Sequence, residues 1–362
     1  MQIDQINNLS FWSKLKKPFI GLSPMDGVTD HPYRYIQKKY GQPDVVYTEF
    51  ATVEGFCRGV TTPLKDFIFD ESQRPIIAQI YGRTSQFFRE TAIVICQLGF
   101  DGVDLNMGCP AKSVANGGSG AALINTPKLA QKIIKATQAG VQDWINGKTV
   151  NDCENITSKI AQEVKKRHLK LSQTYQQHRS IPVSVKTRVG FDSKIIEQWL
   201  PTLLETNPVA IAIHGRTLRQ GYGGKADWET IGKAVEIAKN TSTLIIGNGD
   251  IASKTQALEK VAQYGIDGVL IGRASFGNPW VFNDNFSQEK ITIQQKAQVA
   301  LEHAWLHEKT FGKNEKYSFL PMRKHLGWYI RGFDQAKEVR QKLVMTNNSQ
   351  EVKEILTQYK LL

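Results

Sequence analysis

Length, composition and cysteine usage exclude several classes of protein. The chain has 362 residues, of which 41% are hydrophobic, enough for a large barrel with an appendage and too many for one small domain. Its longest apolar runs fall far short of the roughly 20 residues that a membrane span needs, and its N-terminal segment lacks the apolar core of a signal peptide. The four cysteines form no CxxC pair, so neither a zinc site nor a disulfide framework is expected, and a reducing cytoplasm fits best.

The charge balance points to an anionic partner. There are 46 basic and 34 acidic residues, which give a net charge of +12 and a pI near 9.4. A basic surface of this kind favours a polyanion such as RNA. A generically basic enzyme with no nucleic-acid partner remains the alternative.

Eight short apolar runs alternate with helical segments through the first 280 residues. Each run ends in a polar or glycine-bearing turn, the pattern of strands in βα units. Eight such units in a row predict a parallel sheet that closes as a (β/α)8 barrel, with every polar turn at its carboxyl-terminal mouth. A doubly wound open sheet is the alternative, but it would more often show a GxGxxG turn after the first strand. The predicted strands are 18–22, 44–48, 75–80, 101–105, 182–186, 209–213, 243–247 and 267–271.

The fourth unit carries extra length. A helix is predicted near 127–139, and the segment 140–180 then separates it from the fifth strand. So long a connection is expected to hold a helix of its own, over about 156–170, with a basic cluster at 165–168. This insertion is either a decoration of the barrel or an arm that faces RNA.

From about residue 291 the pattern becomes entirely helical, with amphipathic segments near 294–309, 322–330, 337–343 and 351–361. We therefore expect a barrel domain over 1–284 and a small all-helical domain over 285–362. Aromatic side chains interleave with basic ones between 313 and 331, which suits a phosphate backbone with exposed bases. The aromatics could equally form the core of the bundle. The basic residues are Lys313, Lys316, Arg323, Lys324 and Arg331.

The stretch 100–120, FDGVDLNMGCPAKSVANGGSG, is the most distinctive part of the chain. It passes from a buried strand into a loop with Asn106 and Cys109, followed by a glycine-rich run. An ordinary thiol has a pKa of about 8.5, so Cys109 would be protonated at neutral pH and able to act as a general acid. A lone cysteine is otherwise often a small buried residue, but the polar and glycine-rich surroundings favour the catalytic interpretation.

Two features of the predicted mouth indicate a flavin mononucleotide, FMN. The seventh and eighth strands end in Asn248-Gly249-Asp250 and Gly272-Arg273, where barrels commonly bind a phosphate. A lysine, Lys186, ends the fifth strand inside a run of valines, and a buried ammonium needs an anionic partner. Gln79 and His214, at the ends of the third and sixth strands, add polar groups that suit the flavin ring.

Taken together, the motifs resemble one enzyme family. Over about 18–282 the chain is similar to the tRNA-dihydrouridine synthases, in particular the bacterial B-type branch, and the helical tail fits through residues 322–325. The motifs are SPMDGVTD at 23–30, AQIYG at 78–82, DLNMGCPAK at 104–112, VKTRVG at 185–190, HGRT at 214–217, NGD at 248–250 and GR at 272–273.

The resemblance implies an FMN enzyme that reduces uridine in tRNA to 5,6-dihydrouridine with NADPH, with no metal and no obligate protein partner. Hydride from reduced FMN would reach carbon 6 of the uracil, and Cys109 would protonate carbon 5. Asn106 and Arg216 would face the uracil and the flavin, and Arg323 and Lys324 would bind tRNA. The implied FMN-binding residues are Pro24, Met25, Asp26, Gln79, Lys186, His214, Asn248, Gly249, Asp250, Gly272 and Arg273.

Two competing interpretations remain. One is an FMN barrel that acts on a small molecule, like dihydroorotate dehydrogenase or old yellow enzyme, although such an enzyme would not explain a basic helical tail. The other is a barrel that binds RNA without turnover, which would have no need of an acid at Cys109.

Overall fold

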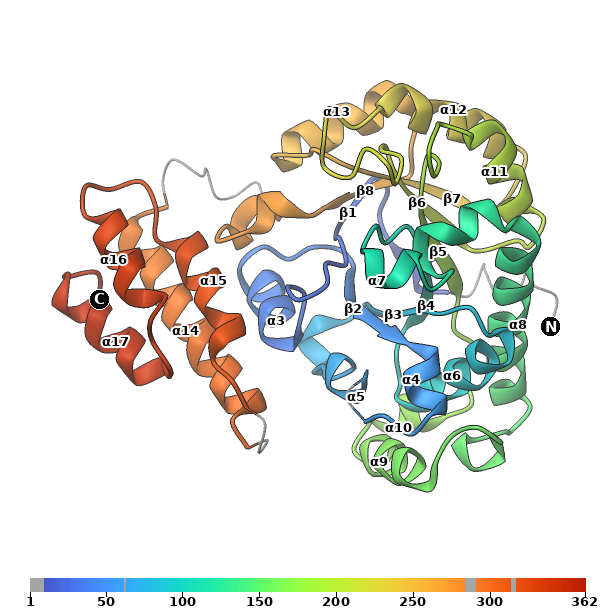
Figure 1. The fold of residues 1–362 in the computed structure, drawn as a ribbon, viewed down its shortest axis with the longest axis horizontal. Coiled ribbons are helices and arrows are strands. Elements are labelled where there is room, and N and C mark those ends of the chain that lie inside the picture. Colours follow the sequence, from blue (N-terminus) through green and yellow to red (C-terminus); the bar gives the residue numbers. More distant parts are fainter. Residues whose placement is uncertain (1–9, 62, 284–290, 314–316) are drawn as a thin grey trace.

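The computed structural model describes residues 10–61, 63–283, 291–313 and 317–362. Eight parallel strands pair in chain order and close on themselves through β1 and β8, which confirms the predicted barrel (Figure 1). The strands are β1 Phe19–Leu22, β2 Val46–Thr52, β3 Ile76–Tyr81, β4 Gly102–Met107, β5 Val183–Arg188, β6 Ala210–His214, β7 Leu244–Asn248 and β8 Gly268–Ile271.

The strands form where apolar, often β-branched residues run together, because both faces of a barrel strand are buried. Helices begin where a polar side chain can accept a hydrogen bond from a free backbone N–H. Asp30 caps the helix that follows β1, and Asp227 caps the helix that follows β6. The helices and short 3-10 turns around the barrel are α2 Phe11–Lys14, α3 His31–Tyr40, α4 Val53–Cys57, α5 Pro63–Asp66, η1 Glu71–Gln73, α6 Ser85–Gln97, α7 Lys112–Ala115, η2 Gly120–Asn125, α8 Pro127–Ile145, η3 Val150–Asp152, α9 Ser158–His168, α10 Gln173–Gln176, α11 Ile196–Leu204, α12 Trp228–Ala238, α13 Lys254–Tyr264, η4 Arg273–Ser275 and η5 Pro279–Phe282.

The insertion covers the outside of the barrel next to α6 (Figure 1). Helix α8 runs to Ile145, one and a half turns past its predicted end, and α9 confirms the helix predicted over 156–170. Two members of the basic cluster bind the barrel through backbone carbonyls, Arg167 to Leu64 and His168 to Gln97. The insertion is thus a packed decoration, and a role toward RNA stays a prediction.

The chain ends in four further helices, α14 Ile293–Phe311, α15 Leu320–Tyr329, α16 Ala336–Leu343 and α17 Ser349–Gln358. They share a hydrophobic core that also takes in Ile36 of α3 and Trp280 of η5. Of the interleaved aromatics, Phe319 and Tyr329 are buried in this core. The predicted boundary at 284/285 and the predicted contact residue Lys316 lie outside the described residues.

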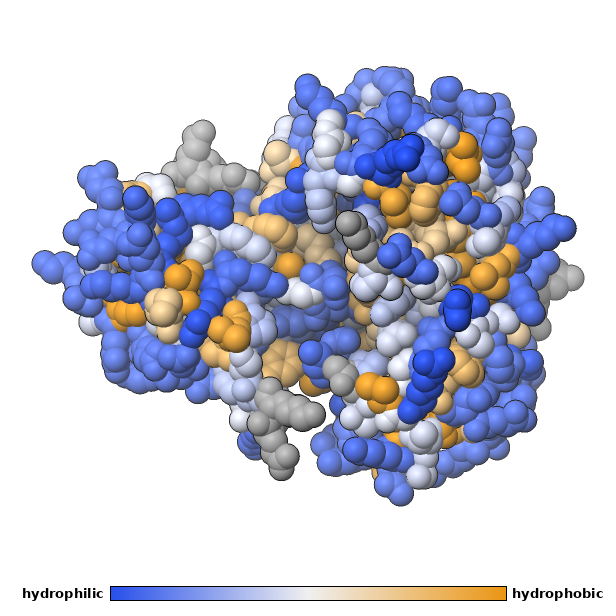
Figure 2. All heavy atoms as spheres, viewed as in Figure 1, coloured by the Kyte–Doolittle hydropathy of each residue, from blue (hydrophilic) through white to orange (hydrophobic). Residues whose placement is uncertain are grey.

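The face shown in Figure 2 is mainly hydrophilic, with hydrophobic side chains in small groups. Among the described residues, no helix is long and apolar enough to cross a membrane.

Candidate active site at the barrel mouth

A cavity of about 960 Å³ opens at the carboxyl ends of the strands. Most of the residues singled out from the sequence line it together, because the ends of parallel strands converge at one face of a barrel. The predicted residues on its wall are Pro24, Met25, Asp26, Gln79, Asn106, Cys109, Lys186, His214, Asn248, Gly249, Asp250, Gly272 and Arg273.

The loop that carries Cys109 is held in a tight turn by Asn106. The Asn106 carboxamide oxygen accepts hydrogen bonds from the backbone N–H groups of Cys109, at 2.8 Å, and of Gly108, at 3.1 Å. The glycine-rich run returns to the same loop, where Gly120 has a φ of +59° and packs against Cys109. Burial raises the pKa of the Cys109 thiol, so the thiol is held neutral with its proton available.

A chain of hydrogen bonds links Asn106 to the barrel interior. Its amide nitrogen donates to Gln79, at 3.0 Å, and the Gln79 amide donates to Asp104, at 2.7 Å. Asp104 also accepts from Ser184, at 2.6 Å. Burial raises the pKa of Asp104 to about 6, against the opposing effect of these donors and of Lys186. Asp104 is fully buried and does not line the cavity, and no signal in the sequence separated it from an ordinary strand residue.

Lys186 projects into the mouth with little to neutralise it. Within the described part of the chain, the side-chain partner of its ammonium is Asn248 Oδ1, at 3.1 Å. Burial, with a contribution from nearby Arg188, lowers the pKa of Lys186 to about 8, against the opposing effect of Asp104. An incompletely paired ammonium in a cavity wall suits an anionic ligand.

His214 shows how positive this side of the mouth is. Burial, reinforced by the positive charges of Lys186, Arg188, Arg216 and Arg273, lowers its pKa to about 2. The imidazole is therefore neutral at every physiological pH. It can donate or accept a hydrogen bond at the cavity without adding charge.

Asp250 ties together the loops that follow β6, β7 and β8. One carboxylate oxygen accepts from Arg216, at 3.0 Å, and from Arg273, at 2.7 Å. The other accepts from Arg216, at 2.7 Å, and from the backbone of Ala226, at 2.8 Å. Arg216 is buried and also donates to two backbone carbonyls of its own loop. The structure thus does not bring Arg216 to the cavity wall, where the resemblance placed it.

The two residues predicted to bind tRNA also lie away from the cavity. Arg323 donates to the backbone carbonyls of Met345 and Thr346, so its guanidinium binds the segment that follows α16. Lys324 donates to the backbone carbonyl of Gly27, in the loop after β1.

Among the residues of the cavity wall that had no assigned role, four carry charged or aromatic side chains. Arg188 lies two residues after Lys186 on β5 and therefore points to the same side, a signal that the sequence did contain. Its guanidinium donates to the backbone carbonyl of Gly108, at 2.6 Å, and so supports the Cys109 loop. Aromatic side chains complete the rim, with Tyr222 69% exposed. These aromatics are Phe50 of β2 and two loop residues, Tyr222 and Phe276.

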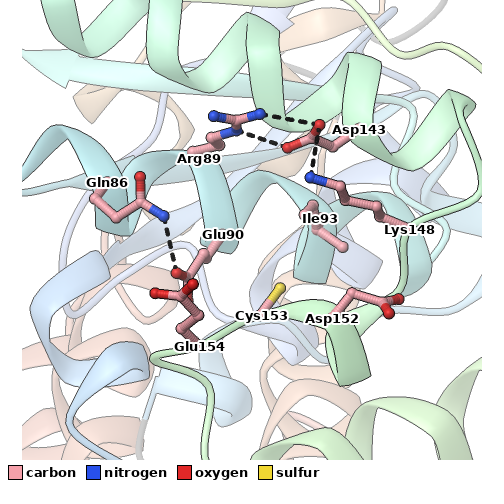
Figure 3. Close-up of a pocket in the computed structure, with 9 residues that line it drawn as sticks. All are labelled: Gln86, Arg89, Glu90, Ile93, Asp143, Lys148, Asp152, Cys153 and Glu154. Carbon is pink, nitrogen blue, oxygen red and sulfur yellow. Dashed lines mark hydrogen bonds and ion pairs between the residues drawn. The ribbon is translucent and has the colours of Figure 1, made fainter.

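A second, smaller cavity of about 190 Å³ lies outside the barrel between α6, α8 and the residues around η3 (Figure 3). Its charged groups satisfy one another, since Asp143 pairs with Arg89 and Lys148. The buried carboxylate of Glu90 accepts from Gln86 and Asn155. Among the described residues, no group of three or more His, Cys, Asp or Glu side chains could hold a metal ion.

A closed parallel barrel with its cavity at the carboxyl ends of the strands is the architecture of (β/α)8 enzymes. The family model for dihydrouridine synthase matches residues 21–166 and 158–361. A probable tRNA-dihydrouridine synthase of Staphylococcus aureus is 34% identical over 361 residues, covering 97% of this chain and 95% of that protein. Probable tRNA-dihydrouridine synthase 2 of Bacillus subtilis is 32% identical over 359 residues, covering 97% and 96%. The chain therefore belongs to the dihydrouridine synthase family and is an oxidoreductase.

Two solved structures are distantly similar in fold. Morphinone reductase aligns with 75% of this chain and 87% of its own at 11% identity, with a TM-score of 0.41. An old yellow enzyme homologue from Zymomonas mobilis aligns with 75% and 89% at 12% identity, also with a TM-score of 0.41. Neither likeness adds to the family assignment.

Proposed function

We propose that the chain reduces uridine in tRNA to 5,6-dihydrouridine, using bound FMN and NADPH as the source of electrons. The observation that carries this proposal is the composition of one cavity. A neutral thiol, Cys109, shares that cavity with an incompletely paired ammonium, Lys186, and a guanidinium, Arg273. The two cationic groups suit a bound anion, and the thiol places a proton donor in the same cavity.

The residues of the mouth fit FMN. The cavity volume lies at the upper end of the range of about 300–1,000 Å³ typical of ligand pockets, which leaves room for a cofactor beside a base. Glycines at 249 and 272 let a ligand approach the backbone, and a Cβ at 249 would meet Ala226 at 2.6 Å. Gln79, Lys186 and His214 would hold the ring system. Arg273 and the two glycines would hold the phosphate.

FMN, when bound and reduced, supplies the hydride that reaches carbon 6 of the uracil. Cys109 donates the proton that carbon 5 requires, and a thiol held neutral by burial is suited to that step. Asn106 fixes the backbone of the Cys109 loop, and Arg188 supports the same loop from β5. The roles are therefore divided between a proton donor and the residues that set its position.

A uracil inside a folded RNA cannot reach this cavity, so the target base must leave its stack and enter the mouth. The net charge of +12 supplies a sequence-independent attraction to the rest of the tRNA. We place the RNA interface on exposed basic residues of the barrel rim and the helical domain. A tRNA substrate implies a cytoplasmic enzyme as part of the same proposal.

Mass spectrometry of tRNA incubated with the purified protein and NADPH tests the proposal. A gain of two hydrogens on a uridine, mapped by position, is the expected result and would also identify the modified site. Protein that carries a reducible flavin but leaves every uridine unchanged would overturn the proposed substrate.

A further inference from the structure

Helix α15 of the helical domain lies directly against the loop that follows β8. The indole of Trp328 stacks on the ring of Phe276, with centroids 4.0 Å apart and an interplanar angle of 7°. The next residue, Gly277, has a φ of +65°, and a Cβ there would come within 2.2 Å of the Trp328 carbonyl oxygen. Phe276 itself lines the cavity, three residues after Arg273. Trp328 of α15 therefore contacts the cavity wall directly, at the ring of Phe276.

A second connection runs through buried polar groups. The Tyr33 hydroxyl lies 2.7 Å from Ser275 Oγ, which donates to the Gly272 carbonyl oxygen, also at 2.7 Å. The Tyr33 ring is enclosed by two histidines of the helical domain, His325 at 5.3 Å and His303 at 5.9 Å between centroids. The position of Gly272 in the cavity wall thus depends on side chains that the helical domain holds in place.

A third contact reaches the neighbouring loop. Lys324, one helical turn before Trp328, donates to the backbone carbonyl of Gly27. Gly27 follows Asp26, which lines the cavity, and β1 pairs with β8 in the barrel. Residues four apart lie on one face of a helix. A single face of α15 therefore contacts both loops on this side of the mouth.

We propose that Trp328 and Lys324 are positioning residues of the cofactor site, so that the helical domain sets how tightly the barrel holds its flavin. This inference rests on the proposed binding of FMN. Trp328 acts through Phe276 on the loop that contains Gly272 and Arg273, at the phosphate end. Lys324 acts through Gly27 on the loop after β1. The two residues should therefore affect different parts of the ligand.

Comparison of FMN with riboflavin, which lacks the phosphate, separates effects at the phosphate from effects at the ring system of the ligand. Dissociation constants are measured by flavin fluorescence on the full-length chain stripped of flavin. Trp328→Ala should weaken FMN binding by about tenfold while leaving riboflavin binding unchanged. Trp328→Phe, which keeps an aromatic ring against Phe276, should restore most of the preference for FMN. Trp305→Ala is the matched control, because Trp305 is 52% exposed on α14.

A preference for FMN over riboflavin that is equal in wild type and Trp328→Ala would overturn the inference. Equal loss of both flavins in Trp328→Ala would also overturn it, because a general loosening of the fold spares neither ligand. If Trp328→Ala does not fold, Tyr33→Phe decides, since it removes only the hydroxyl beside Ser275 and should lower the FMN preference alone. Lys324→Met should weaken both flavins by the same factor while leaving the free energy of unfolding unchanged, and a parallel loss of stability would instead mean a general loosening of the fold. Wild-type protein that binds neither flavin would instead refute the proposed function.

Discussion

The two sides of the barrel mouth differ in their ionisable groups. The ends of β5 to β8 supply guanidinium and ammonium groups around a neutral His214, with the pKa of Lys186 lowered to about 8 by burial. Behind the ends of β1 and β2 lies a group of carboxyls whose pKa values are raised, again by burial first. The pKa of Asp30 rises to about 6, that of Asp66 to about 7 and that of Glu49 to about 8, and repulsion from neighbouring carboxyls contributes to the rise at Asp66 and Glu49.

This difference shows what each side can do. The Lys and Arg side chains can donate hydrogen bonds to a ligand that carries negative charge. The carboxyls on the other side are partly protonated because their pKa values are raised. Cys109 lies between them. After burial and one opposing backbone hydrogen bond, Asp26 raises the pKa of the thiol, while Arg188 and Lys186 lower it. Burial therefore accounts first for the protonated state that the proposed reaction needs, and the charges of the two sides modify the pKa of the thiol in opposite directions.

The largest effect is expected at Cys109 itself. Cys109→Ala removes the proton donor and should lower the rate of dihydrouridine formation by about 10²–10⁴-fold, the usual contribution of a general acid. Reduction of the flavin by NADPH should continue, because that step needs no proton from the thiol. Rapid-mixing absorbance of the flavin and mass spectrometry of the tRNA measure the two steps separately. Unchanged dihydrouridine formation would remove Cys109 from the mechanism.

Glu49 tests the carboxyl side through stability. Its folded-state pKa of about 8 lies above the value of about 4.5 in the unfolded chain, so the folded state binds the extra proton. The stability that comes from this extra proton is complete below about pH 4.5 and is lost as the pH rises through 8. Glu49→Gln keeps the neutral form and should raise the free energy of unfolding at pH 9 by on the order of 2 kcal/mol, with little change at pH 4.

Chemical denaturation across this pH range measures the Glu49 effect. Glu259→Gln, on the exposed face of α13, is the matched control and should show no such dependence. A Glu49→Gln curve that runs parallel to wild type would mean that Glu49 is ionised in the fold at neutral pH.

Lys186 tests the cationic side. Lys186→Met removes the incompletely paired ammonium and should weaken FMN binding by about tenfold. It should also shift the flavin midpoint potential to a more negative value, because the ammonium stabilises the anionic reduced form. Lys233→Met, which breaks an exposed ion pair with Glu197, is the control. An unchanged potential would place the flavin ring away from Lys186.

The contents of the mouth could be predicted because topology determines them. Gln79, Lys186 and His214 are far apart in the sequence, but each lies within two residues of the carboxyl end of a parallel strand, and these ends meet at one face. Arg216 lies only two residues beyond His214, yet it is not among the residues of the cavity wall, and its role toward the uracil and the flavin stays a prediction. Its loop has no periodicity, and its direction depends on Asp250, a partner that approaches from another loop.

The contacts of basic side chains on the C-terminal helices were harder to predict for a related reason. Arg323 and Lys324 are adjacent, and on a helix neighbouring side chains point about 100° apart. One therefore reaches the carbonyl of Met345 and the other that of Gly27. Both partners are backbone groups of distant segments, which carry no signature in sequence. Their positive charge and the family resemblance together predicted an RNA contact for both residues, and that contact stays a prediction.

The smallest effect is expected where the two sides meet. Asp26→Asn removes a negative charge that raises the pKa of Cys109, so the thiol should ionise at lower pH than in wild type. Titration of the thiolate absorbance, in a background with Cys57 and Cys153 replaced by Ser, measures this change. Asp66→Asn is the control. Asp66 is another carboxyl on the same side of the mouth, but it is not among the charges that shift the pKa of Cys109. If both variants lowered the pKa of the thiol equally, the carboxyls on that side would act together, and the pKa of Cys109 would not depend on Asp26 in particular.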